Sequence, residues 1–173
     1  MPVSDDTHAW RRDLPHLQKD GKTFFITFCT RNRTELTPAN RTEVLAVCLW
    51  GHERQYWLIT VTVMPDHVHL LLMPFEGIGL ARIMQRVKGV SSHRIGRGVI
   101  WQREYFDHIM RSDEDVQETA EYISENPVRA GLVKSADDYP WTWNVWRHGD
   151  DTGEAAGATP ADQPGESEGG DAR

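Results

Sequence analysis

The sequence predicts an α+β domain with a ferredoxin-like plan: a β-α-β-β-α-β antiparallel sheet, helices on one face, and a further C-terminal helix. Runs of β-branched and aromatic residues alternate along the chain with segments whose apolar residues have helical spacing. Two successive strand-like runs, 57–63 and 68–73, are separated only by a break at Met64-Pro65-Asp66. This plan serves many chemistries, so it assigns no function by itself.

The first half of the chain predicts a strand, a helix and a second strand. Residues 23–30 are β-branched and aromatic, which is typical of a strand. A helix is predicted over about 38–55, because Thr37 suits the N-cap and Pro38 suits the first turn. Residues 57–63 form the second predicted strand.

The second half predicts the remaining elements in the same way. Residues 68–73 form a third strand, and 80 to about 95 form a helix with an apolar side. An extended stretch follows over 99–110. Ser112 then caps a helix that ends at about Glu125, because the residue before a proline disfavours helix.

The charge of the chain is unevenly distributed. The 173 residues have a net charge of −7, but residues 149–173 contain seven Asp or Glu and one Arg. This segment has no aromatic residue and no Val, Ile, Leu or Met, so we expect a disordered acidic tail. Residues 1–148 contain 18 Lys or Arg and 19 Asp or Glu, and we expect them to form one folded domain.

Several classes of protein are disfavoured by what the sequence lacks. No stretch approaches the roughly 18 apolar residues of a membrane helix, and the N-terminus is polar, so we expect a cytoplasmic protein. The phosphate loop GxxxxGK[ST], the GxGxxG turn and the GxSxG elbow are absent. Cys29 and Cys48 form no CxxC pair, which disfavours a structural zinc site.

The first candidate for chemistry is His67-Val68-His69. Residues two apart in a strand point to the same face, so His67 and His69 share one side and Val68 lies on the other. Two imidazoles about 7 Å apart along a strand can converge on one metal ion, although such pairs are also common as ordinary surface or core residues. Asp66 either supports this pair, binds the metal, or is simply a turn residue after Pro65.

The second candidate is the pair Tyr122 and Asn126. These residues are one turn apart on the last predicted helix and therefore share a side of it. The apolar stripe of that helix is formed by other residues, Val116, Ala120 and Ile123. A tyrosine on a helix flank usually packs at a rim, so a functional role requires a partner nearby.

The third feature is a basic segment. Residues 77–103 contain six Lys or Arg and no Asp or Glu. Solvated helix faces usually mix charges, so an unmixed run fits a surface that contacts phosphates. Two further cations follow the first predicted strand. The predicted DNA-binding residues are Arg31, Arg33, Arg82, Arg86, Lys88, Arg94, Arg97 and Arg103.

Five segments occur in an order that is typical of one known family. They are RRDLPH (11–16), MPDHVHLLL (64–72), WQREYFDH (101–108), YISENPVRAGLV (122–133) and YPW (139–141). They resemble the HUH tyrosine transposases that act on single-stranded DNA, and within these the REP-associated tyrosine transposase branch. The resemblance extends over about residues 10–146.

This resemblance implies an enzyme that cleaves and rejoins single-stranded DNA through a 5′-phosphotyrosine intermediate. It implies that His67, His69 and Asn126 bind Mg²⁺ or Mn²⁺ and that Tyr122 attacks a DNA phosphate. A tyrosine hydroxyl is a weak nucleophile at neutral pH, and a cation that polarises the phosphate compensates for this. The same ligands accept Zn²⁺, Ni²⁺ or Cu²⁺. The implied partner is hairpin or repeat DNA, and both a monomer and a homodimer agree with the resemblance.

The sequence departs from the family pattern at Ser124-Glu125, which is more polar than the apolar pair expected there. Glu125 is therefore a candidate to join the metal ligands or to disturb their electrostatics. Two alternative functions remain: a non-cleaving regulatory protein that binds DNA hairpins, and a metal phosphodiesterase whose product is released by water. Tyr105 is the rival nucleophile, but no side-chain amide lies at helical spacing from it.

Overall fold

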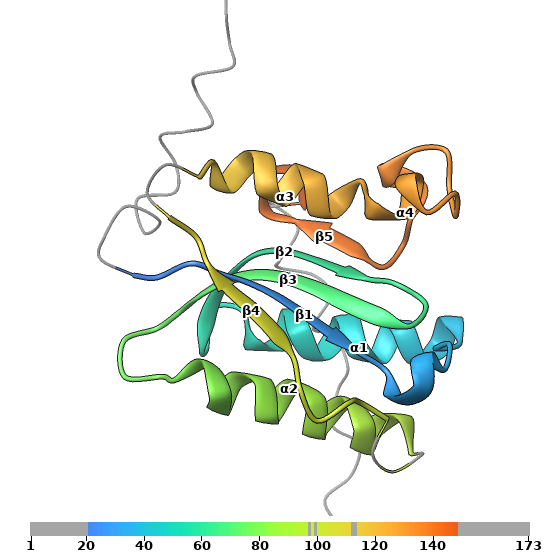
Figure 1. Cartoon of the computed structure of the whole chain (residues 1–173), viewed down its shortest axis with the longest axis horizontal. Helices are drawn as coiled ribbons and strands as arrows, with labels where there is room; N and C mark the ends of the chain where they lie inside the picture. The colour runs from blue at the N-terminus through green and yellow to red at the C-terminus, as the bar shows by residue number, and fades with distance from the viewer. Residues whose placement is uncertain (1–20, 97, 99, 112–113, 149–173) are drawn as a thin grey trace, which may run out of the picture.

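The computed structural model describes residues 21–96, 98, 100–111 and 114–148, which form an antiparallel sheet between two helical layers (Figure 1). The elements in chain order are β1 (Phe24–Cys29), η3 (Arg31–Arg33), α1 (Pro38–Gly51), β2 (Tyr56–Val63), β3 (His67–Pro74), α2 (Leu80–Ile95), β4 (Phe106–Ile109), α3 (Val116–Ser124), α4 (Asn126–Arg129), η4 (Ala136–Asp138), β5 (Thr142–Asn144) and α5 (Val145–His148). The predicted β-α-β-β-α-β plan with a further helix is therefore confirmed.

The sheet has the strand order β4-β1-β3-β2-β5, and each neighbouring pair is antiparallel. Strand β3 lies in the middle, between β1 and β2. In this register His69 lies opposite Thr27 of β1 on one side and Thr62 of β2 on the other. The histidines therefore extend from the centre of the sheet, where both neighbouring strands restrain the backbone.

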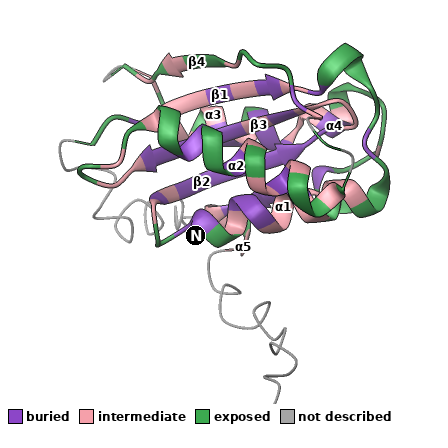
Figure 2. Ribbon diagram, turned by 90° about the horizontal axis from the view of Figure 1, so that it is seen from below, coloured by how far each residue is buried: buried purple, intermediate pink, exposed green. Residues whose placement is uncertain are grey.

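The larger hydrophobic core lies between the sheet and the layer formed by α1 and α2. Val68, Leu70 and Leu72 of β3 point into it and are fully buried. They pack against one side of each helix, whose opposite side is exposed (Figure 2). Because side chains in a strand alternate, His67, His69 and Leu71 point to the other face, as the spacing predicted.

The other face of the sheet is covered by α3, over a much smaller core of Ile59, Leu71, Ala120 and Ile123. A β-bulge makes this possible, because the register between β2 and β3 shifts between Leu58 and Thr60. The extra residue, Ile59, packs under α3, and the strand resumes its alternation beyond it.

Helix α1 ends earlier than predicted, at Gly51 rather than near residue 55. The chain turns back here so closely that a Cβ atom on Gly51 would overlap the Tyr56 side chain. The Tyr56 hydroxyl donates a hydrogen bond to the Cys48 carbonyl, at 2.8 Å. The start of α1 agrees with the prediction, since the Thr37 hydroxyl accepts from the Asn40 amide at 3.2 Å.

The last predicted helix differs from the prediction at its start and agrees with it at its end, near Glu125. Its N-cap is Asp115, whose carboxylate accepts from the amides of Gln117 and Glu118 at 2.8 and 3.0 Å, while Ser112 lies outside the described residues. Helix α3 ends at Ser124, and the short helix α4 starts at Asn126. The break has a simple cause: Pro127 has no N–H to donate to the carbonyl four residues earlier.

The edges of the sheet differ in part from the prediction. The predicted extended stretch 99–110 forms a strand only over β4, although Trp101 makes an isolated bridge to Thr30. Strand β5, which adds an edge next to β2, was not predicted. Residues 149–173, predicted as a tail, lie outside the described residues.

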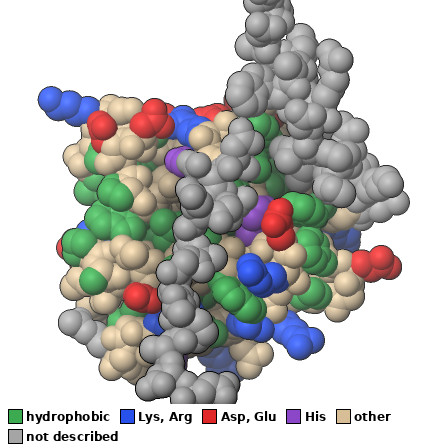
Figure 3. All heavy atoms as spheres, turned by 180° about the vertical axis from the view of Figure 1, so that it is seen from behind, with side chains coloured by type: hydrophobic (Ala, Val, Ile, Leu, Met, Phe, Trp, Pro, Cys, Tyr) green, Lys and Arg blue, Asp and Glu red, His purple; other side chains and the backbone are tan. Residues whose placement is uncertain are grey.

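The surface of the described residues agrees with their nearly balanced charge. In Figure 3, wherever grey atoms do not cover the surface, basic side chains lie beside acidic ones. Binding therefore depends on local groups of charges. Within the described ranges, no helix is long and apolar enough to cross a membrane.

Candidate active site

The two histidines predicted to bind metal lie together at the start of β3, with ring centroids 4.8 Å apart. Both side chains are half-buried on the face that α3 covers. Burial, with further contributions from His67 and Arg129, lowers the pKa of His69 to about 4. His69 is therefore a neutral imidazole at pH 7, which is the form that binds metals.

Each histidine is held through its Nδ1 atom. His67 Nδ1 lies 2.6 Å from an Asp66 carboxylate oxygen, and His69 Nδ1 lies 2.8 Å from the Thr27 hydroxyl. A carboxylate only accepts hydrogen bonds, so Nδ1 of His67 donates to Asp66, and in a neutral imidazole the lone pair is then on Nε2. Such partners orient metal-binding histidines and raise their basicity.

Asp66 therefore supports His67 from the turn between β2 and β3. It also accepts a hydrogen bond from Arg33, at 3.2 Å. Burial raises the pKa of Asp66, but the contacts with His67 and Arg33 outweigh this and hold it below the usual value. The aspartate is thus charged at neutral pH. The position of Asp66 fits two of the three roles predicted for it, a turn residue after Pro65 and a support for His67.

Tyr122 lies on α3 with 58% of its surface exposed. Its helix is fixed over the histidines by a hydrogen bond from the Thr62 hydroxyl to the Ile123 carbonyl, at 3.2 Å. Thr62 is the cross-strand neighbour of His69. In a regular helix the amide of residue 127 would donate to the Ile123 carbonyl, but Pro127 has no N–H. The helix break at Pro127 therefore leaves this carbonyl available to the Thr62 hydroxyl.

Asn126 lies at the start of α4, directly after α3 rather than within the same helix as predicted. Its Oδ1 atom accepts from Arg129 Nη2 at 2.8 Å, and its buried Nδ2 atom has no hydrogen-bond partner among the described residues. A buried polar atom without a partner is costly in an ordinary site. The amide is therefore kept here at a cost in stability.

Arg129 was missed by the sequence analysis. Its guanidinium lies over the Tyr122 ring, 3.7 Å from the centroid, and Nη2 donates to the Tyr122 carbonyl at 2.6 Å and to Asn126 Oδ1. Arg129 thus contacts both residues of the predicted pair. The only signal in the sequence is its spacing, three residues after Asn126 and seven after Tyr122.

The residues present fit a divalent cation. Among the described residues, no three His, Cys, Asp or Glu side chains form a metal-binding group. A site at the two histidines therefore needs a ligand of another kind, and Asn126 offers an amide oxygen. Two imidazole nitrogens and one oxygen suit several divalent metals, and they leave positions open for a substrate.

The polar pair before Asn126 has partners of its own. Ser124, the last residue of α3, is fully buried, and its hydroxyl donates to the Ala120 carbonyl at 2.9 Å and accepts from Asn144 at 3.0 Å. Glu125 lies 3.5 Å from Arg147 of α5. The involvement of Glu125 with a metal stays a prediction.

Four of the predicted DNA-binding cations lie near the ends of the strands or along the β4 side. A groove of about 770 Å³ is lined by Arg31, Lys88 and Arg103, together with Ser92 and Gln102. The Lys88 ammonium donates to the Arg103 carbonyl at 2.9 Å, which shapes the groove wall. Arg33 lies beside Asp66, close to the histidines.

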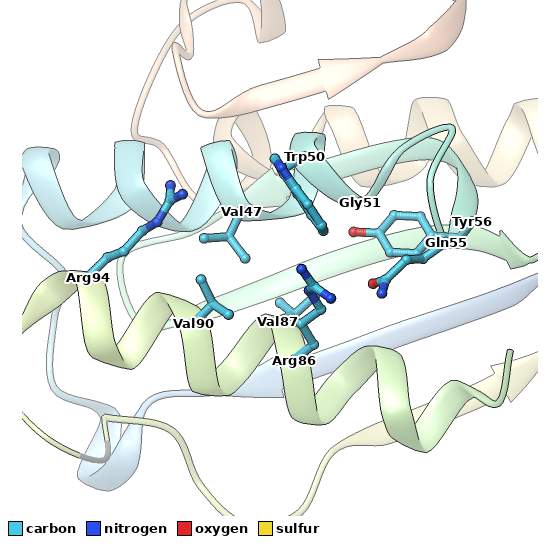
Figure 4. Close-up of a pocket in the computed structure, with 9 residues that line it drawn as sticks. All are labelled: Val47, Trp50, Gly51, Gln55, Tyr56, Arg86, Val87, Val90 and Arg94. Carbon is cyan, nitrogen blue, oxygen red and sulfur yellow. The ribbon is translucent and has the colours of Figure 1, made fainter. Parts of the chain in front are cut away.

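The other predicted cations lie elsewhere. Arg82, Arg86 and Arg94 are exposed residues of α2, which covers the face of the sheet opposite to α3. Arg86 stacks on Trp50, 4.2 Å from a ring centroid (Figure 4). Arg94 pairs with Glu43 at 3.6 Å. Arg97 lies outside the described residues. The predicted basic surface is thus divided between two faces.

Known proteins are similar in both sequence and fold. A family model described as "Transposase IS200 like" matches residues 22–126. A REP-associated tyrosine transposase of Escherichia coli (strain K12) is 27% identical over 125 residues, which are 70% of this chain and 76% of that protein. A putative REP-associated tyrosine transposase of Haemophilus influenzae is 26% identical over 150 residues, 77% of this chain and 83% of that protein.

A solved structure supports the same relationship. The REP-associated tyrosine transposase bound to a REP hairpin superimposes with a TM-score of 0.64 and 26% identity, over 84% of this chain and 87% of that one. The family model, the relatives and the shared sheet agree with the resemblance drawn from the five motifs. The chain is therefore an enzyme of the IS200-like transposase family, similar to the REP-associated tyrosine transposases.

Proposed function

We propose that this enzyme cleaves and rejoins single-stranded DNA with Tyr122 as the nucleophile and with a divalent metal, Mg²⁺ or Mn²⁺, bound by His67, His69 and Asn126. One observation supports this most directly. A single side chain, Arg129, joins Tyr122 to Asn126, and α3, which carries Tyr122, is bonded to Thr62, the cross-strand neighbour of His69. The tyrosine therefore has the nearby partner that a catalytic role requires.

The side chains act on the DNA in distinct ways. The Tyr122 hydroxyl gives up its proton to solvent and its oxygen forms a bond to the phosphorus. The bond between the phosphorus and the 3′ oxygen breaks, and that oxygen takes up a proton from solvent and leaves as a 3′-hydroxyl. The DNA is then held as a 5′-phosphotyrosine, and attack by a 3′-hydroxyl reverses the step. Asp66 and Thr27 keep the imidazoles in place. A bound divalent cation would supply charge stabilisation at the phosphate.

The arrangement disfavours Tyr105 as the nucleophile. Tyr105 packs against the core on the α1 and α2 side of the sheet, and the Lys88 ammonium lies 5.7 Å from its ring centroid. Tyr122, in contrast, lies on the face that also presents the histidines. A nucleophile must approach the same phosphate as the cation, so only Tyr122 meets this requirement.

We propose hairpin or repeat DNA as the substrate, because the solved relative is bound to a REP hairpin. The groove lined by Arg31, Lys88 and Arg103 is the proposed path for the strand that leaves the site. It has three cations and no carboxylate in its lining, as phosphate contacts require.

The experiment is incubation of the full chain with end-labelled single-stranded DNA and Mn²⁺, followed by a denaturing gel. We expect a covalent adduct that chelator prevents, and mass spectrometry should locate the phosphate on the peptide containing Tyr122. Cleavage without an adduct would indicate the phosphodiesterase alternative. Binding of the hairpin without cleavage would instead indicate a regulatory protein. An adduct on Tyr105 would contradict the assignment of the nucleophile.

A further inference from the structure

Arg129 makes three contacts that meet at one guanidinium. The plane lies over the Tyr122 ring at 3.7 Å, Nη2 donates to the Tyr122 carbonyl at 2.6 Å, and the same nitrogen donates to Asn126 Oδ1 at 2.8 Å. A guanidinium can stack and donate hydrogen bonds at the same time, because its donors lie in the plane of the group. A lysine in this position would keep the charge but lose this combination.

These contacts restrain a side chain that has little else to hold it. Tyr122 is 58% exposed, and no hydrogen bond to its hydroxyl is found within the described residues. An exposed tyrosine samples several rotamers, and each one places the hydroxyl somewhere else. Stacking with Arg129 selects among them, because it fixes the plane of the ring.

The backbone holds Arg129 firmly enough to do this. Its amide donates to the Glu125 carbonyl at 3.0 Å, and the Ala130 amide donates to the Asn126 carbonyl at 2.9 Å. The turn is closed by Gly131, whose φ of +72° suits glycine. Arg129 therefore lies one turn after Asn126 on a well-defined segment.

We propose that Arg129 is a positioning residue that clamps Tyr122 and Asn126 into one unit, and that its guanidinium competes with a bound divalent cation for Asn126 Oδ1. The inference rests on the proposed function of the same site. In the metal-free protein the guanidinium is the cation nearest the amide oxygen. Metal binding then has to overcome this hydrogen bond and the repulsion between the two cations.

The clamp predicts two effects of opposite sign for Arg129→Ala. The rate of adduct formation at saturating DNA should fall by about 100-fold, because a nucleophile misplaced by about 1 Å loses that much. The affinity for Mn²⁺ in the absence of DNA, measured by calorimetry, should rise several-fold, because the competing cation is gone. A residue that only stabilised the fold would lower both.

The control is Arg54→Ala. Arg54 makes the same kind of contacts with another aromatic residue, since its guanidinium lies 5.3 Å from the Trp50 ring centroid and Nη1 donates to the Trp50 carbonyl at 3.1 Å. It lies at the other end of the sheet, where β2 begins. We expect normal adduct formation and normal Mn²⁺ affinity in this variant. Arg129→Lys separates the clamp from a simple phosphate contact, which lysine would restore.

The outcomes are distinct. The clamp is wrong if Arg129→Ala keeps the parental rate, if Mn²⁺ affinity is unchanged or lower, or if Arg129→Lys restores the rate. A parent protein that binds no Mn²⁺ and forms no adduct would instead refute the proposed function. In that case, NMR of the metal-free protein with ¹³C-labelled tyrosine rings still tests the clamp. Tyr122→Phe identifies the Tyr122 signal, and Arg129→Ala must shift it; an unshifted signal would overturn the proposal.

Discussion

The side chains of the proposed site differ in how firmly the protein holds them. His67 and His69 each have a partner on Nδ1 and project from a central strand. Tyr122 extends from a helix at the surface and contacts Arg129. The proposed ligands are thus organised in advance, while the proposed nucleophile is restrained by one arginine. Substitutions should therefore affect the metal and the chemistry separately.

Tyr122→Phe should abolish the covalent adduct and leave the protein folded. The change removes one exposed hydroxyl, so the free energy of unfolding should change by less than about 1.5 kcal/mol. Stacking with Arg129 and binding of Mn²⁺ should persist, because the ring remains. Thermal melting, calorimetry and the gel assay measure the three properties. Tyr105→Phe is the matched control, and loss of the adduct only in that variant would reverse the roles of the two tyrosines.

Asp66→Asn should weaken Mn²⁺ binding by about 10- to 100-fold, because the amide supports the His67 imidazole less well than the carboxylate does. His67→Ala should remove most of the binding, while affinity for DNA persists through the phosphate contacts. Calorimetry measures the affinity for the metal. Glu114→Gln is a suitable control, because Glu114 also pairs with a histidine, His108 at 3.0 Å, but on β4. Equal losses of Mn²⁺ affinity in Asp66→Asn and Glu114→Gln would contradict the role of Asp66.

At the scale of the elements, the turn from α1 into β2 contains a buried histidine that is separate from the proposed site. His52 is 9% exposed, and its Nδ1 atom accepts a hydrogen bond from the Leu58 amide at 3.0 Å. Its ring lies against Trp57 and Trp143. Nδ1 must stay unprotonated to accept this bond, so the turn is compatible only with neutral His52.

The stability of this turn should depend on pH. Burial lowers the pKa of His52 below the ordinary value of 6.5, although Glu53 opposes this. Above that value the ring is neutral in both the folded and the unfolded chain. Below it the unfolded chain binds a proton that the folded chain excludes, so the free energy of unfolding decreases as the pH falls. His52→Asn keeps an acceptor and should lose less stability over this range. Thermal melting over a series of pH values, with a chelator present, measures this difference in stability. Parallel pH profiles of the parent protein and His52→Asn would contradict the assignment of the pH dependence to His52.

Local patterns were enough to predict most of the elements and one half of the site. Alternation in β3 placed His67 and His69 on one face, and Thr37 marked the start of α1. The remaining features depend on contacts between distant residues. Thr27 reaches His69 across 42 positions, and β5 has only three residues, which pair with β2. Arg129 reaches Tyr122 past the helix break at Pro127, so helical spacing alone could not reveal the contact.

At the scale of the whole molecule, the sheet separates two surfaces with different properties. The α3 face contains the histidines and Tyr122, and the α1 and α2 face contains Arg82, Arg86 and Arg94. DNA that reaches both has to pass around an edge strand or past the ends of the strands. The groove lined by Arg31, Lys88 and Arg103 lies past the end of β1, and we propose it as this passage.

The salt dependence of DNA binding should identify this passage. Replacing both Arg31 and Arg103 with Ala should reduce the slope of log K against log salt by about 0.7 for each single-strand phosphate that the protein no longer neutralises. Arg94→Ala should change it little, because that guanidinium already pairs with Glu43. Binding measured over a series of salt concentrations gives the slopes. A larger change of slope in Arg94→Ala than in the double variant of Arg31 and Arg103 would place the DNA along α2.

Removal of residues 149–173 should strengthen non-specific binding to DNA. The segment contains seven Asp or Glu and one Arg, so truncation removes negative charge that repels phosphates. We propose that residues 1–148 are the catalytic domain, and the melting temperature and the yield of adduct should then be retained. Filter binding and thermal melting test both expectations. A large drop in melting temperature would show that the segment contributes to the fold.

The small core beneath α3 has a consequence for how the molecule opens. Four buried side chains hold this helix, whereas α1 and α2 share a much larger core with the sheet. Segments with little buried apolar surface unfold locally at a lower free energy than the whole domain. Amide hydrogens of α3 should therefore exchange with deuterated solvent before those of β2 and β3. Tyr122, the proposed nucleophile, would then be able to move away from His67 and His69 while the rest of the protein stays folded.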